Sequence, residues 1–212
     1  MIAARVITII DHPDSIAAAD RCIASAKPFG LTVTKQSAWT PKNNPAGIFA
    51  ERHWSARKFA GNPYCRIDAA MACYLSHATL WQEVVETKQT MIVLEHDAVM
   101  VRALPDLDRA GQVCNLGAPS FGTFKTPPCG NGPLVSKPFM PGAHAYLVTP
   151  KGAADLLAKA IDEAEPTDVF MSLKRFPFLR ENYPWPFECH DSFSTIQLAA
   201  GCVGKHNKVR IV

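Results

Sequence analysis

One stretch of the chain constrains its fold more than any other, an apolar run that ends abruptly in polar residues. Residues 91–94 read MIVL, and Glu95, His96 and Asp97 follow directly. Four consecutive apolar residues bounded by polar ones are typical of a strand buried on both faces, as in the parallel part of an α/β sheet. We therefore predict an α/β fold with this run as an interior strand.

Two carboxylates mark the end of that strand, where open α/β sheets usually bind ligands. Side chains alternate along an extended segment, so we expect Glu95 and Asp97 to point one way and His96 the other. Two carboxylates on one side repel each other unless a proton or a cation lies between them. Their hard oxygen atoms favour Mg²⁺ or Mn²⁺, which can hold a diphosphate. An acidic surface turn at a strand end is the alternative that the motif alone leaves open.

The rest of the chain alternates between strand and helix patterns. A length of 212 residues suits one α/β domain with a substantial core. Apolar residues at spacings of three and four predict a long amphipathic helix over 68–87 that leads into the Met91 strand. The other patterns predict strands at 6–10, 31–35, 112–116 and 143–148, and helices at 16–26, 51–59, 150–164 and from 166 onward. A G-x-G-x-x-G turn is absent, which argues against a classical dinucleotide-binding fold.

Residues 117–142 are crowded with proline and glycine and have no apolar period, which predicts a long irregular segment. Segments of this kind inside a compact domain are usually functional loops or lids, or else disordered. We predict a lid over the carboxyl ends of the strands.

The net charge of +3 suits anionic small molecules such as nucleotide sugars, and it neither requires nor excludes nucleic acid. No apolar run approaches the ~20 residues of a membrane span, and the first residues lack a signal-peptide pattern. Seven cysteines without a C-x-x-C pair predict reduced thiols, mostly core fillers, and not a disulfide scaffold or a zinc site. We therefore expect a cytoplasmic protein, of an oligomeric state that the sequence leaves open.

Three segments resemble, in the same order, motifs of glycosyltransferase family 25, which contains lipopolysaccharide and collagen galactosyltransferases. Residues 72–81 (ACYLSHATLW) are similar to the family's "GC-x-LSH-x-x-x-W" helix, and residues 92–98 (IVLEHDA) to its "ILEDDV" strand. Residues 142–153 (GAHAYLVTPKGA) look like its "GTHAYLISPKGA" strand and helix, and residues 166–171 (PTDVFM) follow where the family has "P-x-D-x-x". These matches cover about half the chain.

The resemblance implies a single GT-A-like (Rossmann-like) α/β domain over 1–212, with a mostly parallel mixed sheet. It also implies a UDP-sugar donor, a divalent metal ion, inversion at the anomeric carbon and a glycan acceptor. On it, Asp97 is the metal ligand, and Glu95 contacts the donor ribose or a metal-bound water. His190 or His206 is the candidate that completes the metal site, as a late histidine does in several GT-A enzymes.

Inversion also requires a carboxylate that takes the acceptor's proton. Asp168 fits by its family position, although capping and dipole complementation at a helix start are alternative roles. Asp191 is the second candidate base. His77 and His144 lie inside matched motifs and are candidate donor-binding residues, and each could instead anchor its element through a backbone hydrogen bond.

The chain also departs from the family pattern. His96 replaces the middle residue of the acidic triplet, Ala70 stands where an acidic residue is expected, and the Arg-rich N-terminal signature is absent. Two alternatives to a glycan-modifying enzyme therefore stay open. One is the same chemistry on a modified base in nucleic acid, with basic residues between 42 and 66 as the binding face. The other is a non-catalytic relative that binds a nucleotide or a sugar.

Overall fold

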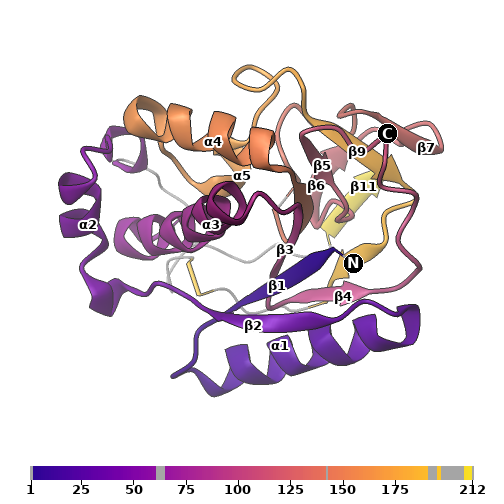
Figure 1. The fold of residues 1–212 in the computed structure, drawn as a ribbon, viewed down its shortest axis with the longest axis horizontal. Helices are drawn as coiled ribbons and strands as arrows, with labels where there is room; N and C mark the ends of the chain where they lie inside the picture. Colours follow the sequence, from indigo (N-terminus) through magenta and orange to yellow (C-terminus); the bar gives the residue numbers. More distant parts are fainter. Residues whose placement is uncertain (1, 61–64, 142, 191–194, 197–207, 212) are drawn as a thin grey trace.

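A seven-stranded mixed sheet forms the centre of the protein in the computed structural model (Figure 1). The structure describes residues 2–60, 65–141, 143–190, 195–196 and 208–211. From edge to edge the strands are β2 (Val33–Ser37), β1 (Ala3–Thr8), β3 (Met91–Glu95), β8 (Ala145–Val148), β5 (Val113–Asn115), β9 (Arg180–Tyr183) and β7 (Gly130–Pro133). Five strands run in one direction, and β8 and β7 run against them. This confirms the predicted α/β class and the mostly parallel mixed sheet.

Helices cover both faces of the sheet. Figure 1 shows α1 (Pro13–Ala26) below the sheet and the other labelled helices above it: α2 (Pro45–Glu51), α3 (Ile67–Thr87), α4 (Pro150–Glu163) and α5 (Thr167–Phe170). Three short 3₁₀ turns lie at Lys27–Phe29, Pro41–Asn43 and Arg57–Phe59. The predicted long helix before the Met91 strand is confirmed as α3, which ends at Lys88 in the left-handed conformation.

Strand β3 is apolar throughout because it is covered on both faces. Met91 and Val93 belong to the core under α3 and α4, whereas Ile92 and Leu94 belong to the core under α1. All four are at most 2% exposed. Burying each such side chain stabilises the fold by roughly 1.5–3 kcal/mol. The strand lies inside the sheet between β1 and β8, as the sequence predicted.

The structure corrects the expectation of an irregular segment at 117–142. This stretch contains β6 (Phe121–Phe124) and β7, and β7 adds an edge strand to the main sheet by pairing antiparallel with β9. β6 pairs with β11 (Lys208–Ile211). Both partners are remote in sequence, so no local pattern announces the strands, and proline is tolerated at a sheet edge. The role of residues 117–142 as a lid stays a prediction.

Two further elements differ from expectation. The helix expected at 51–59 lies earlier, as α2, because Asn44 accepts a hydrogen bond from the backbone of Gly47 and Pro45 occupies the first turn. Residues 98–100 and 187–189 form a two-stranded ribbon, β4 (Ala98–Met100) with β10 (Phe187–Cys189), which the sequence did not predict.

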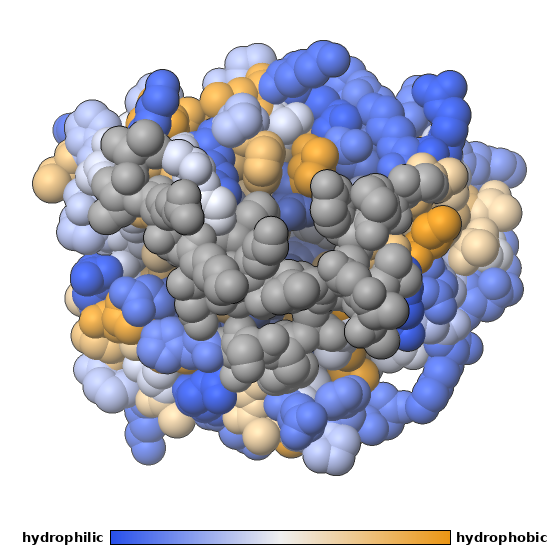
Figure 2. Space-filling model, turned by 180° about the vertical axis from the view of Figure 1, so that it is seen from behind, coloured by the Kyte–Doolittle hydropathy of each residue, from blue (hydrophilic) through white to orange (hydrophobic). Residues whose placement is uncertain are grey.

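The described surface is mixed in character. Figure 2 shows hydrophilic residues over much of the face opposite to that of Figure 1, with apolar residues in separate small groups. Within the described ranges, none of the helices has the length and apolar character needed to cross a bilayer.

Candidate functional site

The candidate site lies at the edge of the sheet where β1, β2 and β3 end together. The parallel register pairs Ile7 with Glu95 and Thr8 with Ser37, so the three carboxyl ends are level. β8 enters the same edge, and the carbonyl of His144 accepts the Glu95 N–H at 2.9 Å. Glu95 is therefore held by the sheet at the place where open α/β sheets bind ligands.

Three predicted carboxylates gather at this edge: Glu95 and Asp97 from the end of β3, and Asp168 from a remote segment. Burial raises the pKa of Glu95 well above its usual range, and the charges of Asp97 and Asp168 raise it further. Burial also raises the pKa of Asp168, where Lys137 acts in the opposite direction. Lys137 comes from the 117–142 segment and is only 7% exposed. The site thus concentrates negative charge, with one buried ammonium group beside it.

Asp97 has the environment of a ligand-binding carboxylate. It is 9% exposed, and its Oδ2 accepts a hydrogen bond from the Cys189 thiol at 2.9 Å. Its Oδ1 is buried and has no hydrogen-bond partner among the described residues. Leaving a buried acceptor unsatisfied costs about 1–3 kcal/mol, and more for a charged group. An incoming cation or donor would remove this cost.

The expected alternation of side chains stops short of Asp97. β3 ends at Glu95, and residues 96 and 97 form a turn, so the period-two argument does not extend to them. His96 Nδ1 lies 3.0 Å from Ser15 Oγ at the start of α1. Ser15 Oγ also accepts the Ile9 N–H at 2.9 Å, which ties the hydroxyl to the segment that follows β1. The residue that departs from the family pattern therefore anchors the turn to α1.

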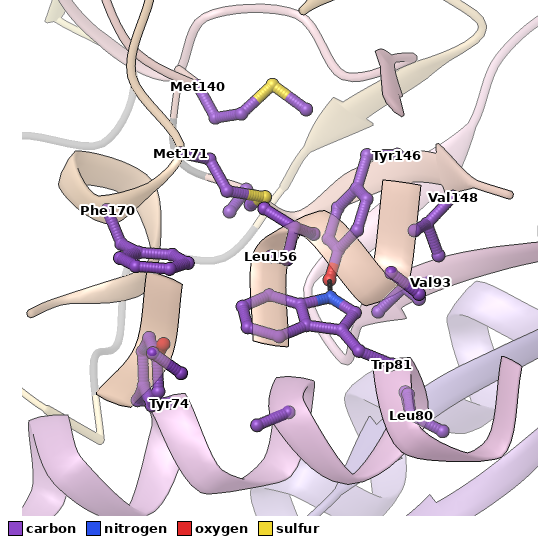
Figure 3. Close-up of a cluster of buried hydrophobic side chains, with 14 of the residues drawn as sticks. Tyr74, Leu80, Trp81, Val93, Met140, Tyr146, Val148, Leu156, Phe170 and Met171 are labelled. Atoms are coloured by element: carbon purple, nitrogen blue, oxygen red, sulfur yellow. Dashed lines mark hydrogen bonds between the residues drawn. The ribbon is translucent and has the colours of Figure 1, made fainter. Parts of the chain in front are cut away.

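A chain of hydrogen bonds holds Glu95 from behind. Trp81 Nε1 donates to Tyr146 Oη at 2.8 Å, a contact drawn in Figure 3. Tyr146 Oη lies 2.9 Å from His77 Nδ1, and His77 Nε2 lies 3.1 Å from Glu95 Oε1. An indole N–H only donates, and the His77 tautomer with its proton on Nε2 fits these contacts, because Tyr146 then donates to Nδ1 and the ring donates to Glu95.

The protonation state of His77 agrees with this chain. Burial lowers the pKa of His77 to about 3, with the charge of Asp168 acting in the opposite direction. The neutral ring donates from Nε2 to Glu95, so one carboxylate oxygen is oriented by the core. His77 was predicted to bind the donor; here both of its nitrogens are engaged within the protein. Its visible role is to position Glu95.

The other predicted histidines lie differently. His144 is 2% exposed, and its ring lies against Gly117, where any Cβ would collide with the imidazole. The backbone N–H of His190 donates to the Asp97 carbonyl at 3.1 Å, but the His190 ring is largely exposed and lies 3.3 Å from Glu188. The neighbour that reaches the Asp97 side chain is Cys189. The predicted candidates Asp191 and His206 lie outside the described residues.

Asp168 makes a backbone contact at the start of α5 and also lies in the electrostatic environment of Glu95. Its Oδ1 accepts the Val169 N–H at 2.9 Å at the start of α5, as a helix-terminal acid does. It is also half-buried and close enough to Glu95 to raise the pKa of that residue. The contact with Val169 lies within the first turn of α5 and does not remove Asp168 from the site.

Sequence reasoning missed three residues near these carboxylates: Lys137, Cys189 and Cys73, whose Sγ lies within 4.8 Å of ligand atoms of His77 and Glu95. Lys137 and Cys189 reach the carboxylates through pairings between remote segments, which leave no local signal. Cys73 did carry one, because it lies four residues before His77 on a predicted helix and such residues share a face.

The fold and this edge define an α/β protein with an acidic ligand site at the carboxyl ends of its strands. Residues 56–109 match the model of glycosyltransferase family 25, described as an LPS biosynthesis protein. The matched segment includes α3, β3 and both Glu95 and Asp97. It covers about a quarter of the chain, confirms the resemblance to this family and supports its assignment as a glycosyltransferase. A comparison with curated proteins finds no match.

Proposed function

We propose that the protein moves a sugar from a nucleotide-sugar donor, a UDP-sugar, to a hydroxyl of a glycan, with inversion, and that residues 1–212 act as one domain. The observation that carries this proposal is the pairing of Glu95 with Asp97 at the carboxyl edge of the sheet, inside the segment that matches the family. A donor diphosphate brought to this edge needs its charge compensated, because the site is itself acidic.

The residues present fit a hard divalent cation, Mn²⁺ or Mg²⁺. Asp97 offers a buried oxygen that has no hydrogen-bond partner among the described residues, and its charge acts on Glu95. Carboxylate oxygens are the preferred ligands of both ions. When bound, such an ion supplies positive charge against the departing diphosphate. Asp97 and Glu95 would hold it.

Asp168 is the candidate general base. An inverting transfer needs a carboxylate that accepts the proton of the acceptor hydroxyl. Burial raises the pKa of Asp168, which moves it toward the working pH and makes it a better proton acceptor. The backbone hydrogen bond from Val169 and the charge of Lys137 act against that rise in pKa and favour the ionised form that a base needs.

Screening UDP- and GDP-sugars with Mn²⁺ tests the proposal without knowledge of the acceptor. One UDP-sugar should be hydrolysed slowly, since water can replace the acceptor, and chelation of Mn²⁺ should stop the release of UDP. The variant Asp155→Asn is a matched control, because Asp155 is a surface acid on α4 paired with Lys151. Binding of UDP without hydrolysis of any donor would instead support the non-catalytic alternative.

The described residues of the basic segment give the nucleic-acid alternative no specific support. Lys42 forms an ion pair with Asp11, and Lys58 pairs with Glu163. Arg52 lies over the Trp54 ring at 5.0 Å. These basic residues have partners within the protein, so a glycan acceptor remains the proposal.

A further inference from the structure

Three side chains beside the proposed donor site combine sulfur, nitrogen and oxygen ligands. The Cys73 Sγ, a ring nitrogen of His77 and a carboxylate oxygen of Glu95 lie within 4.8 Å of one another. We propose that these residues form a second cation site, selective for a thiophilic divalent ion such as Zn²⁺. Tetrahedral zinc has bonds of about 2.0–2.3 Å, so its ligand atoms need only a modest approach.

The secondary structure frames this triad firmly. Cys73 and His77 are four residues apart on α3 and therefore face the same side of the helix. Glu95 ends β3, which follows α3 after a short connection. Cys73 and Glu95 are each partly exposed, which gives an ion a path to the buried His77.

The contacts behind His77 resemble those of a metal-binding histidine. Such a histidine usually donates its second ring N–H to a fixed acceptor, which orients the ring. His77 Nδ1 faces Tyr146 Oη at 2.9 Å, and Trp81 fixes that hydroxyl in turn. On binding, the imidazole proton moves from Nε2 to Nδ1, where it is donated to Tyr146 Oη. The Tyr146 hydroxyl proton then has no acceptor, so zinc binding loses one hydrogen bond. Three metal–ligand bonds form in exchange.

The charge balance of the site also favours a cation. Burial raises the pKa of the Cys73 thiol well above its usual range, and Glu95, Asp168 and Asp97 add to the rise. A divalent ion counteracts both burial and the neighbouring negative charges, because its positive charge stabilises the thiolate. The thiol then gives its proton to solvent, and the thiolate bonds to the metal. The same ion offsets the repulsion between Glu95 and its acidic neighbours.

Ligand chemistry distinguishes this site from the one proposed at Asp97. Thiolate and imidazole favour Zn²⁺, whereas carboxylate oxygens favour Mn²⁺ and Mg²⁺. Glu95 belongs to both sets, so zinc would withdraw it from the donor site and inhibit transfer. This consequence rests on the proposed function, but zinc binding itself does not.

Cobalt titration tests the binding directly, because Co²⁺ replaces Zn²⁺ and a Co²⁺–thiolate bond absorbs in the near ultraviolet. We expect the wild-type protein to gain this band, Zn²⁺ to abolish it, and Cys73→Ser to lack it. Cys189→Ser is the matched control, since Cys189 is the thiol that contacts Asp97. A band that persists in Cys73→Ser, or that disappears in Cys189→Ser, would place the metal elsewhere and overturn the proposal.

A second variant tests whether Tyr146 orients the His77 ring for metal binding. Tyr146→Phe removes the acceptor of Nδ1 and should weaken Zn²⁺ affinity by about 10–100-fold, the usual effect of losing such a contact. Unchanged affinity would exclude His77 as a ligand. Transfer that resists saturating Zn²⁺ would overturn the sharing of Glu95, whereas an absent transfer activity with an intact cobalt band would contradict the proposed function alone.

Discussion

The site has two halves that are built in different ways. One half is the α3–β3 unit, in which His77, Glu95 and Asp97 come from one continuous stretch of sequence. The other half consists of Lys137, Asp168 and Cys189, each carried to the edge by a different remote segment. In the first half, buried hydrogen bonds from Trp81, Tyr146 and His77 lead to Glu95, whereas the second half supplies single side chains. We infer that the α3–β3 unit provides binding geometry and the remote half provides chemistry.

The sharpest way to break this division is Asp168→Asn. Asparagine keeps the shape and caps a helix about as well, but it cannot accept the acceptor's proton. We expect donor binding to stay near wild type and the transfer rate to fall ~10²–10⁴-fold, the usual contribution of general acid–base catalysis. Single-turnover rates and UDP affinity measure the two effects separately. Near-normal turnover would leave Asp168 with only its backbone contact at the start of α5 and move the assignment to Asp191.

Asp97→Ala should affect binding first. Removal of the buried carboxylate takes away the proposed metal ligand. We therefore expect the gain in UDP affinity caused by Mn²⁺ to be at least about tenfold smaller than in wild type. Calorimetry with and without Mn²⁺ measures this difference. If the folded variant binds UDP with the full Mn²⁺ dependence, the metal lies elsewhere.

The pH dependence of stability tests the buried end of the α3–β3 unit. The pKa of His77 is lowered to about 3 from 6.5. The contribution of the neutral ring to the free energy of unfolding is therefore present above pH 6.5 and is lost as the pH falls toward 3. The raised pKa of Glu95 acts in the opposite direction, because the folded state gains a proton. Glu95→Gln removes this opposition. In that variant we expect the contribution of His77 to the free energy of unfolding to fall by about 2 kcal/mol from pH 7 to pH 5.

Denaturant unfolding of Glu95→Gln at the two pH values measures this loss. Glu95→Gln with His77→Gln is the reference that lacks the imidazole, and the difference between the two variants isolates it. If the free energy of unfolding changes equally with pH in both variants, His77 is not held neutral by burial.

The smallest expected effect concerns the end of the hydrogen-bond chain. Tyr146→Phe leaves the buried Trp81 N–H without its acceptor, so we expect a loss of about 1–3 kcal/mol in the free energy of unfolding. Tyr183→Phe, at a tyrosine on β9 that stacks edge-on with Trp185, provides a comparison outside the site. An equal effect of the two substitutions would argue against a special role for the chain behind Glu95.

Much of the fold and half of the site follow from local patterns. The period of α3 and the MIVL run predicted a helix followed by a buried strand, because covering both faces of a strand requires unbroken apolar sequence. The acidic end of that strand predicted the position of Glu95 and Asp97. The motif resemblance added Asp168, which geometry then placed near Glu95.

The remainder was decided by pairings between remote segments. The 117–142 segment looked irregular because the partners of β6 and β7 lie far along the chain, and a strand at a sheet edge needs no apolar alternation. Lys137 and Cys189 reached the site by the same means. The sequence by itself determined the α/β class, the interior strand and its acidic end, since these depend on local periodicity and burial. Only the tertiary structure decided that His77 supports Glu95 and that Cys73 joins them, because those contacts depend on how α3 packs against β3 and β8.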